Sequence, residues 1–169
     1  MGMDGEEFFE GLDELADRNR KLVEGEEEEV REGRGREVDL QILREIVYSL
    51  ESVSMGTHQL LYFSAMKYAR TYLECESEGL EEAVERLSGI FDKMNLGTLS
   101  LRDGDGTELE LEENAFTHDA PESGRKMCYF LAGYIAGFLE NCLGASYVVN
   151  ETSCSAEVEG ACVFRVQER

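Results

Sequence analysis

The chain has 169 residues, which suits one domain of ordinary size, with or without a short additional segment. Its formal net charge of −21 argues against binding nucleic acids through the overall electrostatic field, because phosphates attract clustered cations. The charge also disfavours anionic membrane surfaces, and no run of about 18 apolar residues suggests a membrane span. The N-terminal residues lack the basic and apolar regions of a signal peptide, so we expect a cytoplasmic protein.

Residues 1–37 are predicted to form a helical arm followed by an acidic linker. Apolar residues recur at helical spacing in the arm, at Phe8, Leu12, Leu15 and Leu22. The stretch Glu24–Glu37 combines three glycines with dense charge, which is typical of a solvated linker. We therefore place the main domain at residues 38–169, and leave open whether the arm docks on its own domain or on a second subunit.

Three amphipathic helices are predicted in the first half of this domain. The first has its apolar stripe at Leu43, Ile46, Val47, Leu50 and Val53. The second follows Gly56, is capped by Thr57, and has its stripe at Leu60, Leu61, Tyr68, Tyr72 and Leu73. The third is capped by Ser77 and has its stripe at Leu80, Ala83, Val84, Leu87, Ile90, Phe91 and Met94.

The apolar period then changes from 3.6 to 2, which predicts strands. Leucines alternate with polar residues on both sides of Asp103–Gly106, at Leu99, Leu101, Leu109 and Leu111. Asp103–Gly106 is interpreted as a hairpin turn, because a calcium loop would require a glutamate where Asn114 stands. A long helix is expected at about 123–143, followed by strands at 147–149 and 161–166. This order predicts an α+β fold in which helices pack on an antiparallel sheet.

Five cysteines are present, and an odd number in a cytosolic chain argues against a disulfide scaffold. Cys154 and Cys162 face each other across a predicted turn at 157–160, a geometry that permits a shared metal ion or a disulfide. Cys128 and Cys142 lie 14 residues apart on the long helix, about 21 Å along its axis, so they cannot bind one ion together. The residues alone do not choose between these two. Cys75 is expected to be a thiol without a partner.

Three segments carry a resemblance to a known family: Cys128–Leu139, Val149–Cys154 and Cys162–Val166. They resemble the 4-vinyl reductase domain family, most clearly over residues 95–168. That family is similar to the ligand-binding fold of nitric-oxide signalling and Golgi-transport proteins. It includes stand-alone archaeal proteins and the sensor domains of aromatic-responsive transcription activators.

The resemblance implies a structural zinc ion held by Cys128, Glu151, Cys154 and Cys162. Because a strict strand would point Glu151 away from Cys154, its participation requires a bend at Thr152–Ser153. Four protein ligands would leave no open coordination position, so such an ion would tie the long helix to the last hairpin rather than catalyse a reaction. The alternative is four buried side chains without a metal.

Val158 stands where the family often has a glycine, midway between the last two cysteines, and Gly160 follows two residues later. This departure leaves the register of the last hairpin open.

Other sites give weaker signals. Gly133 and Gly137 favour close packing of another backbone against the long helix. His58 and His118 are interpreted as capping or surface residues. The aromatic residues are interpreted as core, namely Tyr62, Phe63, Tyr68, Tyr72, Phe91, Phe116, Tyr129, Tyr134 and Phe138.

The resemblance therefore implies a zinc-stabilised domain that binds or senses a small hydrophobic or aromatic molecule. We also expect a homodimer, because association with a second copy would let the domain report its ligand. Two alternatives remain: a reductase or accessory protein acting on a vinyl-bearing tetrapyrrole, and a dimeric assembly partner. Catalysis is disfavoured, because the sequence has no dinucleotide-binding glycine motif and no conspicuous acid–base pair.

Overall fold

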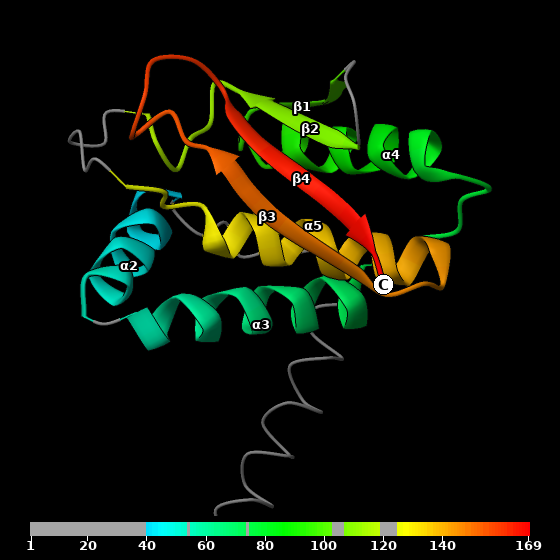
Figure 1. Cartoon of the computed structure of the whole chain (residues 1–169), viewed down its shortest axis with the longest axis horizontal. Helices are drawn as coiled ribbons and strands as arrows, with labels where there is room; N and C mark the ends of the chain where they lie inside the picture. The colour runs from blue at the N-terminus through cyan, green and yellow to red at the C-terminus, as the bar shows by residue number, and fades with distance from the viewer. Residues whose placement is uncertain (1–39, 54, 74, 103–106, 119–124) are drawn as a thin grey trace, which may run out of the picture. The chain divides into compact units, whose positions relative to one another are not determined.

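Four helices and four strands make up the part of the chain that a computed structural model describes, namely residues 40–53, 55–73, 75–102, 107–118 and 125–169 (Figure 1). These residues belong to the unit Asp39–Arg169. The helices are α2 (Leu40–Val53), α3 (Met55–Tyr72), α4 (Leu80–Lys93) and α5 (Tyr129–Leu143). The strands are β1 (Thr98–Arg102), β2 (Glu108–Glu112), β3 (Tyr147–Ser153) and β4 (Cys162–Glu168). The predicted arm and linker at 1–37 and the predicted turn Asp103–Gly106 lie outside the described residues.

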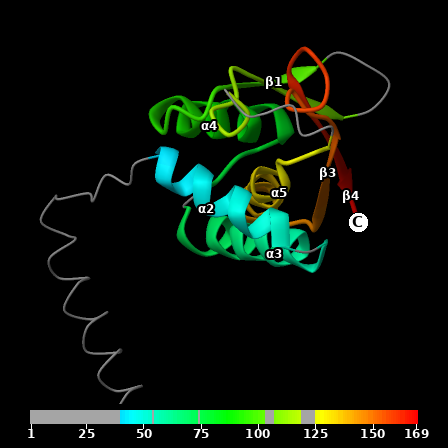
Figure 2. The same ribbon diagram turned by 90° about the vertical axis from the view of Figure 1, so that its left-hand side faces the viewer.

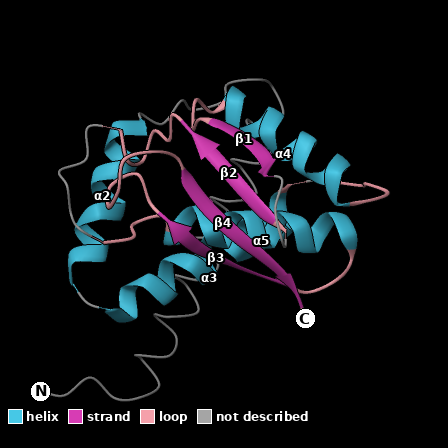
Figure 3. Ribbon diagram, turned by 45° about the horizontal axis from the view of Figure 1, so that its top comes forward, coloured by secondary structure: helices cyan, strands magenta, loops and turns pink. Residues whose placement is uncertain are grey.

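The strands form one antiparallel sheet in the order β1-β2-β4-β3, as Figure 3 shows. The predicted alternation is confirmed in β2, where Leu109 and Leu111 are fully buried between exposed or half-buried glutamates. In β3 the pairing register shifts between Glu151 and Ser153. This irregularity is the bend that the sequence required for Glu151 to approach Cys154.

Helix α5 lies between β3 and α3, and Figure 2 shows it nearly end-on. Every residue from 131 to 139 is buried, as expected for a helix surrounded by protein. A Cβ atom at Gly133 or Gly137 would overlap the backbone carbonyl oxygen of Tyr62 or Met66 in α3, respectively. The expectation that these glycines allow close packing is therefore confirmed.

Two expected core stripes are partly wrong. In α3, the stripe residues Leu60, Tyr68 and Tyr72 are exposed, as is Phe63, which was also expected in the core. The buried positions are Leu61, which the stripe included, and Ala65 and Ala69. The reason is the close approach of α3 and α5, because only small side chains fit where two helix backbones nearly touch. In α2, Val47 is buried, but Ile46 and Leu50 are 52% and 39% exposed.

Predicted helix ends also differ from the structure. Helix α5 begins at Tyr129, with Cys128 as its N-cap, so residues 125–128 are not helical. Residues 119–124 lie outside the described residues. The N-cap of α4 is Gly79 without a side-chain hydrogen bond, and Thr57 lies inside α3, so neither expected cap is observed.

A disulfide joins Cys75 to Cys142, across a sequence separation of 67 residues. The prediction that Cys75 is a thiol without a partner is therefore wrong. The bond connects the segment between α3 and α4 to the last turn of α5. None of the described helices combines the length and apolar character that crossing a membrane would demand.

Candidate metal centre

Four side chains converge where the N-terminus of α5 meets the β3–β4 hairpin. Cys128 is the N-cap of α5, Glu151 belongs to β3, Cys154 follows β3, and Cys162 is the first residue of β4. One ligand atom of each lies within 4.8 Å of all the others. The cysteines are at most 1% exposed and Glu151 is 8% exposed. This arrangement brings together all four residues that the family resemblance singled out.

The sulfur spacing suits a shared metal ion. Cys128 Sγ lies 3.9 Å from Cys154 Sγ and 3.7 Å from Cys162 Sγ. Two thiolates bound tetrahedrally at about 2.3 Å from zinc stand roughly 3.8 Å apart. All three cysteines are free, so the disulfide that the sequence left open for Cys154 and Cys162 is not formed.

The surroundings of the Glu151 carboxylate are a second indication of a cation-binding site. Its Oε2 atom accepts a hydrogen bond from the backbone N–H of Cys128 at 3.0 Å. Its Oε1 atom is buried without a hydrogen-bond partner among the described residues. Burial raises the pKa of this carboxyl group, against the hydrogen bonds from Cys128 that lower it. An unpaired, buried carboxylate oxygen beside three sulfurs is what a cation-binding site requires.

The three thiols titrate as a group. The sulfur of Cys162 accepts hydrogen bonds from Cys128 and Cys154, and also from Ser155, which together lower the pKa of Cys162 well below its ordinary value. Hydrogen bonds to Cys154 and Cys162, together with burial, raise the pKa of Cys128. The pKa of Cys154 is also raised, because its bond to Cys162 and burial outweigh the hydrogen bond from Cys128. The cluster thus holds one thiolate readily and two thiols that keep their protons.

Three polar residues around the sulfurs were not connected with them by sequence reasoning. Asn114 donates to Cys128 and Cys162, Ser155 approaches Cys162, and the Oγ1 atom of Thr117 lies 2.5 Å from the Oγ atom of Ser155. Asn114 and Thr117 follow β2, at a sequence distance of 45 residues or more from Cys162. Only the folded sheet reveals their position, since no metal-binding motif includes them.

The two histidines lie outside this cluster. His58 stacks on Tyr129, with ring centroids 4.2 Å apart and an interplanar angle of 8°. His118 is exposed, and its backbone oxygen accepts a hydrogen bond from Arg44 at 2.8 Å. The expectation of a surface role therefore fits His118, whereas His58 has an aromatic contact that the sequence did not indicate.

A groove of about 610 Å³ runs between α3 and the edge strand β3. Aromatic side chains share its walls with aliphatic, polar and charged ones, and the residues relevant here are His58, Tyr62, Phe63, Tyr129, Glu140 and Tyr147. The hydroxyl of Tyr62 accepts a hydrogen bond from the backbone N–H of Val149 at 3.2 Å. A carboxylate oxygen of Glu140 accepts one from the backbone N–H of Tyr147 at 3.3 Å. These two side chains therefore cover donors on the free edge of the sheet.

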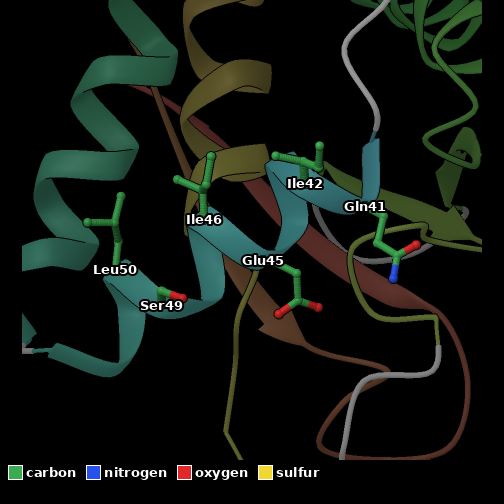
Figure 4. A pocket seen from close by; sticks show the side chains of 6 residues that line it. All are labelled: Gln41, Ile42, Glu45, Ile46, Ser49 and Leu50. Atoms are coloured by element: carbon green, nitrogen blue, oxygen red, sulfur yellow. The ribbon is translucent and has the colours of Figure 1, made fainter.

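A second, shallower depression of about 540 Å³ is lined, among the described residues, by side chains of α2. Figure 4 shows Ile42, Ile46 and Leu50 projecting from one side of this helix, with Gln41 and Glu45 on another. The three aliphatic side chains, called here the α2 apolar face, are 58%, 52% and 39% exposed.

Comparison with known proteins places this arrangement in context. A protein of Methanocaldococcus jannaschii is 37% identical over 81 residues, 48% of this chain and 44% of the relative. Another from the same organism is 22% identical over 135 residues, 79% of this chain and 80% of the relative. This chain thus spans less than half of the first relative and most of the second.

Two solved structures share the fold. A vinyl-4-reductase family protein from M. jannaschii has a TM-score of 0.57 and 21% identity, over 80% of this chain and 85% of that one. The phenol-responsive sensory domain of the transcription activator PoxR, solved with phenol, has a TM-score of 0.56 and 13% identity, over 80% and 77%. The vinyl-4-reductase domain model matches residues 107–168, which include all four residues of the cluster. The resemblance to the 4-vinyl reductase family is therefore confirmed by a family-model match that covers residues 107–168 of this chain.

Proposed function

We propose that this chain is a cytoplasmic small-molecule-binding protein whose domain is held together by one structural zinc ion. The ligands would be Cys128, Glu151, Cys154 and Cys162. The observation that carries this proposal is the buried cluster of three sulfurs and one carboxylate within 4.8 Å. Thiolate-rich tetrahedral donor sets favour zinc among the common divalent ions, and four protein ligands close the coordination sphere. Such an ion stabilises structure and offers no open position for a substrate.

The small molecule in this proposal is hydrophobic or aromatic, and the groove between α3 and β3 is its binding site. A volume of about 610 Å³ lies within the usual range for ligand pockets, roughly 300–1,000 Å³. Phe63 supports the assignment, because an aromatic side chain that is 62% exposed at the wall of a groove can gain buried area from a ligand. The fold shared with a phenol-responsive sensory domain also supports it.

Two chain segments each contain a proposed zinc ligand next to a residue of the groove wall. Tyr129 lines the groove and directly follows Cys128, and Asn150 lines it and directly precedes Glu151. Zinc binding would therefore fix two positions of the groove wall. In this proposal the metal holds Tyr129 and Asn150 in position through their neighbours in the chain, and it does not contact the ligand.

We further propose that the chain forms a homodimer through the α2 apolar face. Its three exposed aliphatic side chains lie on one side of a helix, and burying them against a second copy would remove them from water. The reductase and assembly-partner alternatives stay predictions, since no observation on the described residues favours either.

Native mass spectrometry of the full chain, purified gently with its thiols kept reduced, tests the proposal. The expected result is one zinc ion per chain and a mass of two chains. Adding aromatic compounds from a panel should then give a complex with one bound molecule per chain. Protein that carries no metal, while folded and reduced, would contradict the zinc assignment.

A further inference from the structure

One buried amide lies against two of the proposed zinc ligands. Asn114 is 4% exposed and follows β2. Its Nδ2 atom lies 3.2 Å from Cys128 Sγ and 3.1 Å from Cys162 Sγ. The amide thus bridges the sulfur at the start of α5 and the sulfur at the start of β4.

The orientation of this amide is fixed by its own turn. Its Oδ1 atom accepts a hydrogen bond from the backbone N–H of Phe116 at 2.9 Å. Because a backbone N–H can bond only to the oxygen of the amide, the nitrogen must face the sulfurs. The backbone oxygen of Asn114 also accepts from the N–H groups of Thr117 and His118. The side chain is therefore held in place independently of the cysteines.

The charge of an occupied site gives this contact its importance. A dication with three thiolates and one carboxylate carries a formal charge of 2 − 4 = −2. This charge would be buried in a chain whose net charge is already −21. Buried negative charge is tolerated when hydrogen-bond donors surround it. The amide of Asn114 offers two N–H donors, and the backbone N–H of Ser155 reaches Cys162 Sγ at 3.4 Å.

We propose that Asn114 is a positioning residue of the metal centre, whose two side-chain N–H groups donate hydrogen bonds to the thiolates of Cys128 and Cys162. These bonds hold the two sulfurs at their observed separation of 3.7 Å and spread the negative charge of the occupied site. The inference rests on the zinc site proposed above. An aspartate at this position would present oxygen lone pairs to the sulfurs in place of donors.

Zinc affinity of Asn114→Asp tests the inference, measured on the full chain by competition with a chromophoric chelator. We expect the affinity to fall 10- to 100-fold, the usual effect of removing a partner of a metal ligand. Asn95→Asp is the matched control, because it makes the same chemical change at an exposed residue after α4 and should stay within about twofold of the wild type. An Asn114→Asp affinity within that twofold margin would overturn the inference. Wild-type protein that binds no zinc would instead overturn the proposed function.

A spectroscopic measurement on the wild type keeps the test valid if Asn114→Asp does not fold. The chain is labelled with ¹⁵N and loaded with a spin-active cadmium isotope as the probe ion. Through-bond coupling between cadmium and the side-chain amide protons of Asn114 is expected, because an N–H···S bond transmits it. A folded, cadmium-loaded sample with no such coupling would mean that the amide of Asn114 donates no hydrogen bond to the metal-bound sulfurs. That result would overturn the inference.

Discussion

The carboxylate of Glu151 accepts a hydrogen bond from the backbone N–H of Cys128, with 3.0 Å between oxygen and nitrogen. This bond joins the irregular part of β3 to the N-terminus of α5, where the helix dipole favours negative charge. It uses one carboxylate oxygen and leaves the other buried without a partner among the described residues. The hydrogen bond thus aligns two of the proposed ligands with each other.

Replacing Glu151 by glutamine should abolish tight zinc binding while preserving the shape of the side chain. The amide oxygen can still accept from Cys128, but a neutral amide is a far weaker ligand than a carboxylate. When free zinc is about 1,000 times the dissociation constant, losing the ion costs about 4 kcal/mol of stability. Chemical denaturation with and without a chelator measures this loss. Glu157→Gln, an exposed change in the same hairpin, is the control and should behave as the wild type.

Zinc affinity should rise with pH. The pKa values of Cys128 and Cys154 are raised, so both thiols are protonated near neutral pH, whereas the lowered pKa of Cys162 leaves it ionised. Zinc must displace the two protons, and the logarithm of its affinity should therefore change by about two per pH unit around pH 8. Chelator competition at several pH values and proton release into weak buffer measure this number. A slope near zero would contradict the assignment of one proton each to Cys128 and Cys154 in the metal-free protein.

Alanine at Gly133 should destabilise the protein by about 1–3 kcal/mol, the typical cost of overpacking, because its Cβ would overlap the Tyr62 carbonyl oxygen across the α3–α5 contact. The matched control is Gly89→Ala in α4, where a Cβ would meet nothing within 4 Å. That change should stabilise by roughly 0.5–1 kcal/mol through helix propensity. Urea denaturation compares the two variants, and equal effects would refute the close contact.

Reducing the Cys75–Cys142 disulfide should lower stability by about 2–4 kcal/mol, because the bond closes a long loop in the unfolded chain. Cys75→Ser should show the same loss under oxidising conditions and respond no further to a reductant. Zinc content should not change, since neither cysteine belongs to the cluster. Thermal unfolding with and without reductant checks this, and a reductant-insensitive wild type would argue against the bond.

Phe63→Ala should weaken the thermal shift that an aromatic ligand produces, by removing one wall of the groove. A tenfold or greater loss of affinity is expected, corresponding to about 1.4 kcal/mol or more. Tyr72→Ala provides the comparison, because Tyr72 is also exposed on α3 but does not line the groove. Equal ligand responses of both variants would place the binding site elsewhere.

Much of the fold follows from residue periodicity. The alternating leucines predicted the β1–β2 hairpin, and the apolar run before Gly144 predicted most of α5. The buried face of α3 was predicted only in part, because a stripe chosen by large apolar side chains includes Leu61 but overlooks Ala65 and Ala69. The α3–α5 contact is filled by backbone and small residues, so Phe63, Tyr68 and Tyr72 turn outward.

The residues of the candidate site were predicted by different kinds of evidence, and some were not predicted at all. Spacing alone brought Cys154 and Cys162 together, but only the family resemblance selected Cys128 over Cys142. The actual partner of Cys142 is Cys75, and the separation of 67 residues leaves no local pattern that could link them. Asn114 was equally hidden, since its contact with Cys162 depends on the pairing of β2 with β4.

X-ray absorption at the zinc edge of the purified, metal-loaded chain tests the central claim most directly. A tetrahedral site built from the four clustered residues should show three sulfur neighbours at about 2.3 Å and one oxygen at about 2.0–2.2 Å. A shell made only of oxygen and nitrogen would mean that the cysteines of the cluster do not bind the ion. A shell of four sulfurs would exclude Glu151 as a ligand and contradict the proposed link between β3 and α5.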